Sequence, residues 1–211
     1  MTDETEIKRF VVDCERLPLH FPTHRHSPEF WEALGRAVAT FGFLEETLGK
    51  AIFAFMATRR IPADTIDEEY KRWLPTLEKA VTDPLGGLIN AYEEAVRANS
   101  DATIPNLQDL LSHLREVAAR RNVICHGSWR SPDDQGRSVP FYVDKKRGVW
   151  ETPIDVAHLV QLRQQVAELS CAVVNSVTQM GYQFPGSKGP GKPVFQSQRE
   201  NERGSAKDSG V

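Results

Sequence analysis

The sequence predicts an all-α protein, an antiparallel bundle of about four to six helices with a small β-hairpin insert before the last helix. Apolar residues recur at helical spacing, every three or four positions, over several long stretches. One segment, about 137–152, instead has the alternation and turn residues of a hairpin. With 211 residues, 40% of them hydrophobic, the chain is long enough for one core and an accessory element.

Composition excludes several classes of protein. The net charge is −3 and the pI about 6.1, so any contact with RNA or DNA must come from a local basic patch. The three widely spaced cysteines favour a reducing compartment without disulfides or a zinc site. The polar N-terminus is unlike a signal peptide, and there is no apolar run of membrane-spanning length. We therefore expect a cytoplasmic protein with no membrane contact, no metal and no cofactor.

Composition along the chain suggests three parts. Residues 1–27 mix short apolar pieces with prolines and predict an irregular N-terminal arm. Its His24 and His26 lack a third ligand, so we expect a solvated loop there and not a metal site. Residues 28–183 form the predicted helical domain. Residues 184–211 are rich in Gly, Pro, Ser, Lys and Gln and predict a disordered tail.

The helices of the domain have recognisable starts and stops. Ser27-Pro28-Glu29 combines a cap, a first-turn proline and a first-turn acid, which predicts a helix to about Ala57. Its expected apolar face consists of Leu34, Val38, Phe41, Leu48, Ile52 and Phe55. A second helix is expected at about 65–81, kinked or restarted near Pro75. Asp83-Pro84 opens a third, with Leu85, Leu88, Ile89, Tyr92 and Val96 inward.

The segment after residue 127 predicts turns and two short strands, Val139–Val143 and Val149–Glu151. Their connection carries three consecutive basic residues, Lys145, Lys146 and Arg147. Such a tip is usually solvated, but it can also contact a phosphate backbone, and Arg130 and Arg137 are further candidates. A last long helix is expected from Thr152-Pro153 to Gly181, with Leu159, Leu162, Val166, Leu169, Val173, Val177 and Met180 on its inner face.

An arginine in an apolar stripe distinguishes the helix that begins near Pro105. Arg121 lies near the middle of the stripe formed by Leu107, Leu110, Leu111, Leu114, Val117, Ala118, Ile124 and Cys125. A buried guanidinium is costly unless a carboxylate pairs with it. Glu45 falls within the apolar face of the first helix, whereas Glu46 points away and can pair with Lys50. We therefore expect Glu45 and Arg121 to meet across the core, whether as a plain buried salt bridge or as part of a site.

A histidine and an amide accompany Arg121. His126 precedes Gly127, a helix stop, and Asn122 lies four residues earlier on the same face as His126. His126 can serve in proton transfer or simply interact with the C-terminus of its own helix, and Asn122 can equally be a surface or interface amide. A Cys125–His126 nucleophile is rejected because adjacent side chains on a helix point about 100° apart.

Arg121-Asn122-x-x-x-His126 resembles the Arg-polar-x-x-x-His motif of the HEPN superfamily, over roughly residues 28–182. The resemblance implies an all-α domain that often acts as an RNase in toxin–antitoxin, abortive-infection and other defence systems. In that family the motif ends a late bundle helix, and an acid on an earlier helix, here Glu45, is often part of the site. A strand-like insert after the motif departs from a minimal helical bundle.

The resemblance implies a metal-independent endoribonuclease, plausibly a toxin or defence effector, that acts as a homodimer on RNA and leaves a 2′,3′-cyclic phosphate. His126 would transfer protons, Arg121 would stabilise the phosphate and Glu45 would orient Arg121. Asn122 would orient the imidazole or donate to a phosphate oxygen. An antitoxin or other regulatory protein is a candidate partner. The alternatives are a non-catalytic HEPN-like module that binds RNA, a nucleotide or a partner protein, and a structural helical dimer.

Overall fold

The structure is a computed structural model. It describes residues 10–65, 67–68, 71, 74–75 and 83–189. Within this part of the chain the α-helices are α1 (Pro28–Ala57), α3 (Leu85–Ala98), α4 (Leu107–His126) and α5 (Val156–Thr178), with two short 3₁₀ helices, η1 (Cys14–Arg16) and η2 (Ala63–Thr65). The all-α bundle predicted from the sequence is confirmed. None of the described helices combines the length and apolar character needed to cross a lipid bilayer.

Helix α1 begins and ends where the sequence predicts. Ser27 accepts a hydrogen bond from the backbone N–H of Phe30 at 3.3 Å, and Pro28 occupies the first helical position. At the other end, Asn99 is 3% exposed and donates to the Phe55 carbonyl at 2.9 Å. This amide joins the C-terminal ends of α1 and α3 and satisfies a carbonyl left free where α1 ends.

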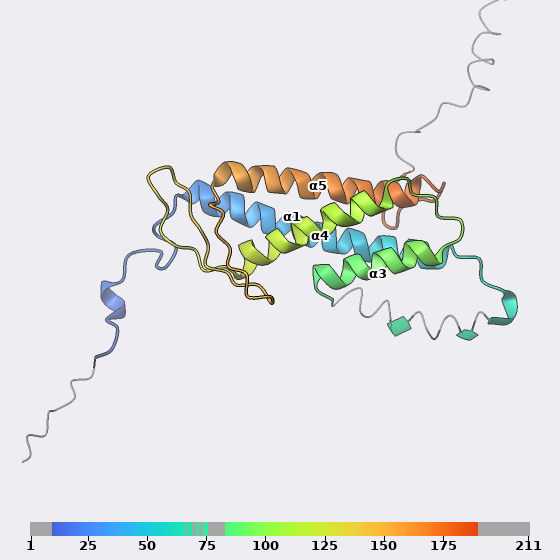
Figure 1. Ribbon diagram of the computed structural model, residues 1–211, viewed down its shortest axis with the longest axis horizontal. Coiled ribbons are helices and arrows are strands. Elements are labelled where there is room, and N and C mark those ends of the chain that lie inside the picture. Colours follow the sequence, from blue (N-terminus) through green and yellow to red (C-terminus); the bar gives the residue numbers. More distant parts are fainter. Residues whose placement is uncertain (1–9, 66, 69–70, 72–73, 76–82, 190–211) are drawn as a thin grey trace, which may run out of the picture.

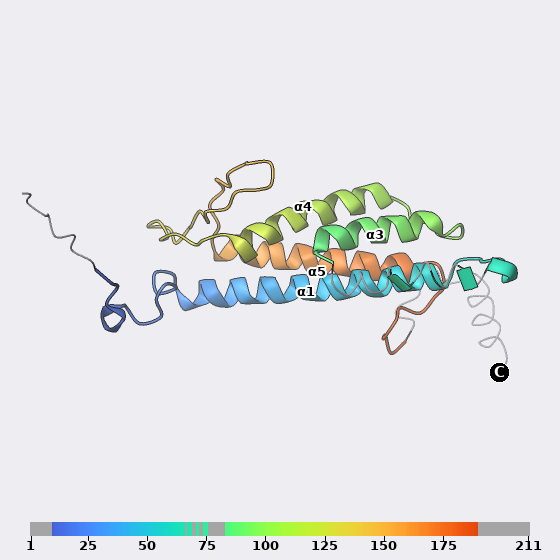
Figure 2. The same ribbon diagram turned by 90° about the horizontal axis from the view of Figure 1, so that it is seen from below.

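The helices are arranged around α1, which packs against α3, α4 and α5 and has its most extensive contact with α5 (Figure 1). Helix α4 runs opposite to its neighbours, as an antiparallel bundle requires, but α1, α3 and α5 run in the same direction (Figures 1 and 2). The sequence places 27 residues, 58–84, between α1 and α3, and a separation of this length allows parallel neighbours.

The core lies where α1 meets the other three helices. Tyr92 of α3 is fully buried, and its hydroxyl donates to Ser176 of α5 at 2.8 Å. Burial raises the pKa of Tyr92 to about 12, so this hydroxyl stays protonated as a donor. One predicted core residue is wrong: Val38 of α1 is 39% exposed.

The predicted β-hairpin at about 137–152 is not formed by strands. Within 83–189 this region is a loop with isolated antiparallel bridges, of which one joins Val143 to Val149. Asp144 instead organises the chain reversal, because its carboxylate accepts the backbone N–H groups of Lys146 at 2.7 Å and Gly148 at 2.8 Å. The alternating residues have one short partner segment and no sheet to join, so the ladder does not extend.

Three predicted segments lie outside helices α1, α3, α4 and α5: the N-terminal arm, the helix expected at 65–81 and the tail. Residues 10–27 form a mostly exposed, irregular arm, and apolar side chains such as Phe10 and Val11 lie in solvent. Most of the helix expected at 65–81 and most of the tail expected at 184–211 lie outside the described residues. Phe184, at the start of that tail, is 7% exposed and belongs to the core. Helix α5 begins at Val156, after the cap Asp155, a few residues later than Thr152-Pro153 predicts.

Candidate functional site

Arg121 lies on the side of α4 that faces α1 and bridges two other predicted site residues. Its Nη2 is 3.5 Å from Oε1 of Glu45 on α1, and its Nη1 is 3.4 Å from Nε2 of His126. The predicted contact between Glu45 and Arg121 is therefore present. It forms because α4 crosses α1 at this point and places the two misplaced charges opposite each other. One guanidinium thus links a carboxylate to an imidazole.

The sequence suggests a fully enclosed ion pair, but in the structure the pair is only half-buried. The Arg121 side chain is 25% exposed and that of Glu45 is 28% exposed. Glu45 lies two helical turns after Val38 on the same face of α1, and both side chains are partly exposed. Its Oε1 nevertheless has no access to solvent and accepts no hydrogen bond from any described residue. The carboxylate therefore depends on Arg121 for its stabilisation, while the outer side of the guanidinium remains open to an anion.

The end of α4 fixes the position of His126. Gly127 ends the helix, and its backbone N–H donates to the carbonyl of Val123 at 2.8 Å. A Cβ atom at residue 127 would lie 2.5 Å from that carbonyl oxygen and 2.8 Å from the side chain of Pro140. The glycine is required by this close approach and not by its backbone angles, because its φ is −71°. The sequence predicts the stop, and the structure supplies its steric cause.

The segment that follows His126 is anchored by aromatic packing. Trp129 packs edge-on against Phe30 at the start of α1, with 5.0 Å between ring centroids, and edge-on against His26 at 6.3 Å. Burial lowers the pKa of His26, which favours the neutral ring inside this cluster. The cluster attaches the chain leaving α4 to the N-terminus of α1, and it therefore holds the exit from the Arg121–His126 pair in place.

The imidazole of His126 is exposed, and the chemistry of the two side chains fixes which of them donates in its contact with Arg121. Arginine has no acceptor atom, so in the 3.4 Å contact the guanidinium must donate and Nε2 must accept. Asn122 is also exposed, and its side chain makes no hydrogen bond with the described residues. Both side chains are accessible to a ligand that reaches Arg121.

Cys125 is the remaining reactive group near Arg121. Burial raises the pKa of its thiol, Arg121 opposes this change and Glu45 adds to it. A thiol with a raised pKa is a poor nucleophile at neutral pH, which agrees with the rejection of Cys125 as a nucleophile. Among the described residues no group of three His, Cys, Asp or Glu side chains is arranged to hold a metal ion.

The basic residues predicted to bind RNA are exposed but lie in a separate group. Lys145, Lys146 and Arg147 surround the turn organised by Asp144, and Arg147 has a φ of +66°. The guanidinium of Arg130 lies 5.2 Å from the ring centroid of Phe141. Within the described chain no hydrogen bond or ion pair joins these residues to Arg121 or His126. Their predicted role in RNA binding stays a prediction.

Comparison with known proteins does not place the chain in a family. No family model, curated protein or solved structure matches it. The resemblance of residues 121–126 to the HEPN motif therefore rests on these residues and their geometry alone.

Sequence reasoning missed a second polar group, on the side of α4 that faces α5. Arg120 faces α5 and shares a groove with His158 and Gln161. One signal was available in the sequence, because Asp155 and His158 have the spacing of an N-cap and the third helical residue. The expected helix start at Thr152-Pro153 concealed this spacing.

Proposed function

We propose that this chain is a HEPN-like, metal-independent endoribonuclease in which Arg121 and His126 act on a phosphodiester of RNA. One observation carries the proposal: the guanidinium of Arg121 contacts both Glu45, at 3.5 Å, and the Nε2 atom of His126, at 3.4 Å. A cation held by a carboxylate and placed beside an accessible imidazole suits phosphate recognition combined with proton transfer.

The chemistry follows from these positions. Arg121 binds a non-bridging phosphate oxygen, which brings the neighbouring 2′-hydroxyl towards His126. When Arg121 turns to the phosphate, its contact with Nε2 of His126 is released, and the freed Nε2 lone pair accepts the hydroxyl proton as the 2′-oxygen attacks phosphorus. The bond to the 5′-oxygen breaks, and that oxygen takes up a proton. The products are a 2′,3′-cyclic phosphate and a 5′-hydroxyl end, and no metal or other co-reactant is needed. Asn122 can donate a hydrogen bond to a phosphate oxygen from the exposed side of α4.

A second copy of the chain completes this proposal. The base that removes the first proton and the acid that protonates the leaving oxygen act on opposite sides of phosphorus, and one exposed His126 fills one of these roles. We therefore include a two-fold homodimer in the proposal, with His126 of each copy facing a common cleft. The molar mass in solution, measured by light scattering, distinguishes this dimer from a monomer.

The decisive experiment incubates the purified protein with labelled single-stranded RNA in EDTA. His126→Ala should reduce the cleavage rate by about 10²- to 10⁴-fold, the usual contribution of general acid–base catalysis. His113→Ala is the matched control, because His113 is exposed on the same helix and outside the cluster. Equal cleavage by the wild type and by His126→Ala would refute the proposed endoribonuclease. RNA binding without cleavage by the wild type would favour a non-catalytic binding module.

The half-buried ion pair supports a second candidate, a structural helical dimer braced by Glu45 and Arg121. Both side chains are about one-quarter exposed, and the Oε1 atom of Glu45 has lost its solvent contact. Such a pair can be retained for stability alone. If Arg121→Ala fails to fold while His126→Ala folds normally and the wild type has no activity, the brace is the better interpretation.

A further inference from the structure

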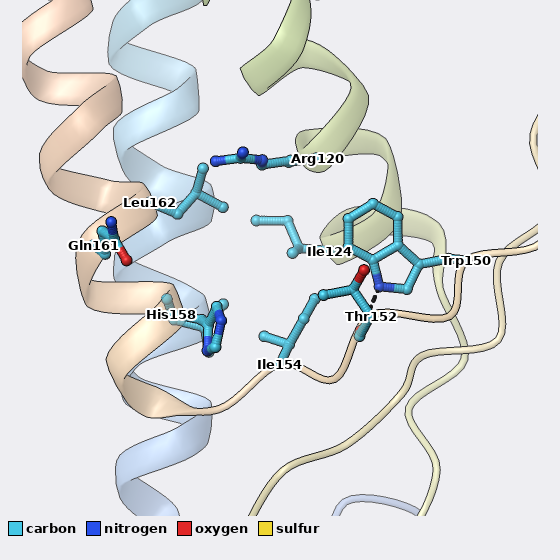
Figure 3. Close-up of a pocket in the computed structure, with 9 residues that line it drawn as sticks. Arg120, Ile124, Trp150, Thr152, Ile154, His158, Gln161 and Leu162 are labelled. Atoms are coloured by element: carbon cyan, nitrogen blue, oxygen red, sulfur yellow. Dashed lines mark hydrogen bonds between the residues drawn. The ribbon is translucent and has the colours of Figure 1, made fainter.

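A groove outside the Arg121 site lies between α4, α5 and residues 150–154 (Figure 3). Its volume of about 320 Å³ is at the lower end of the range of small-molecule sites. The floor is apolar and almost fully buried. It consists of Ile124, Ile154, Leu159 and Leu162.

Polar side chains with unused hydrogen-bonding capacity line the rim of this groove. Arg120 donates from Nη1 to Gln165 at 3.0 Å and from Nη2 to Glu116 at 2.6 Å, which leaves three of its five N–H groups. The side chain of Gln161 makes no hydrogen bond with any described residue and offers both a donor and an acceptor. Figure 3 shows these side chains around one space.

His158 is oriented by its own helix start. Its Nδ1 lies 2.8 Å from Oδ1 of Asp155, the residue that caps α5. The backbone N–H of His158 is the main cause that lowers the pKa of Asp155, so the carboxylate stays charged and accepts the Nδ1 proton. The Nε2 atom of His158 makes no hydrogen bond with any described residue and can therefore pair with a ligand in the groove.

Trp150 forms the wall opposite α5. Its Nε1–H donates to the Thr152 carbonyl at 2.7 Å, which fixes the orientation of the indole (Figure 3). A fixed aromatic wall beside an aliphatic floor favours a flat aromatic ring as the occupant. A sugar would leave its hydroxyls unpaired on that floor, and an alkyl chain would leave the polar rim unused.

We propose that this groove binds a nucleotide, with the base on the floor against Trp150, the base edge at Gln161 and His158, and the phosphate at Arg120. The charge of Arg120 is largely balanced by Glu116, so the base must supply most of the affinity. A free nucleotide and a nucleotide within single-stranded RNA share this chemistry. The site is independent of cleavage at Arg121 and His126, because the two arginines face different helices.

Isothermal titration calorimetry tests the groove with the four ribonucleoside monophosphates, a short single-stranded oligoribonucleotide and inorganic phosphate, in EDTA. All titrations use the variant His126→Ala, which should not cleave RNA. The oligoribonucleotide then stays intact, and binding in the groove is measured separately from the proposed cleavage. At least one base-containing ligand should bind, and phosphate alone should not. Gln161→Ala should weaken binding about tenfold, the loss expected for one well-placed pair of hydrogen bonds.

Gln164→Ala is the matched control, because Gln164 is exposed on the same helix and bonds to Glu168 away from the groove. Binding by monophosphates identifies a free nucleotide as the ligand, and binding by the oligoribonucleotide alone identifies RNA. The proposal is overturned if no base-containing ligand binds at millimolar concentration. It is also overturned if phosphate alone binds equally well, or if Gln164→Ala and Gln161→Ala have the same effect.

Discussion

Arg120 and Arg121 are adjacent on α4 but face different neighbouring helices. Arg121 faces α1, where Glu45 is its partner from another helix and His126 lies beside it. Arg120 faces α5, where Gln165 is its partner and Glu116 of its own helix balances its charge. The two sides therefore contain the same cation in different surroundings.

The surroundings of the two arginines indicate that the neighbours of an arginine, and not its charge, determine what it can do. Beside Arg121 the described groups are a carboxylate without another hydrogen bond and an exposed imidazole, which suit charge stabilisation and proton transfer. Beside Arg120 lie an apolar floor and an aromatic wall, which suit binding of a ring. We therefore propose chemistry for the first side and recognition for the second.

Exchanging each arginine for alanine should give the largest contrast. Arg121→Ala should lower RNA cleavage by about 10²- to 10³-fold, because it removes the cation that would stabilise the transition state in the proposed mechanism. Arg120→Ala should keep the cleavage rate on a short substrate within a few-fold of wild type and should weaken nucleotide binding in the groove. Single-turnover cleavage rates and calorimetry on both variants measure the contrast. Similar losses of cleavage in both variants would remove the distinction between the two sides.

Glu45→Gln should have the next largest effect. The amide keeps the size of the side chain but loses the charge that holds Arg121 in place, so the cleavage rate should fall about tenfold, equivalent to about 1.4 kcal/mol. Glu46→Gln is the matched control, because Glu46 pairs with Lys50 at 2.5 Å on the outer surface of α1. An equal fall in both variants would show that general charge, and not the position of Glu45, matters for cleavage.

The sequence predicts the Arg121 side better than the Arg120 side for physical reasons. Arg121 and Glu45 each interrupt an apolar stripe, and a misplaced charge is visible from helical spacing alone. Gly127 is a helix stop in any context. The exposure of Val38 and the groove beside Arg120 depend on how α4 and α5 cross, which no local pattern encodes. The predicted hairpin was wrong because alternating apolar and polar residues indicate a strand only where a sheet is available for it to join.

Asp155→Ala should destabilise the fold by about 1 kcal/mol, the usual value of an N-cap. The pKa of Asp155 is lowered in the folded chain, chiefly by the backbone N–H of His158. Its stabilisation is therefore complete above the ordinary carboxyl pKa of about 4 and is lost as the pH falls through the lower, folded value. The stability difference between wild type and variant, measured by urea unfolding, should shrink below about pH 4.

Asp155→Asn separates the two parts of that effect. Asparagine can cap a helix but does not titrate, so it should keep most of the stability and lose the pH dependence. A pH dependence that persists in Asp155→Asn would assign the effect to another carboxyl group. Since Asp155 also orients His158, Asp155→Ala should weaken nucleotide binding in the groove without changing RNA cleavage.

Alkylation of the cysteines should give the smallest effect and the most local one. Cys14 and Cys171 are exposed, whereas Cys125 is partly buried and its thiol has a pKa raised by that burial. Iodoacetamide should therefore modify Cys125 several times more slowly than the other two at pH 8, as measured by mass spectrometry of peptides.

The charges beside Cys125 make its alkylation rate report on the Arg121 side. Glu45 raises the pKa of this thiol, so Glu45→Gln should increase the thiolate fraction and speed alkylation. Glu46→Gln and Arg120→Ala should leave the rate unchanged, because the first lies on the outer surface of α1 and the second faces α5. A faster reaction in Arg120→Ala would mean that the charge of Arg120 reaches across α4. In that case the two sides of this helix would be one electrostatic unit, and catalysis and recognition could not be assigned to them separately.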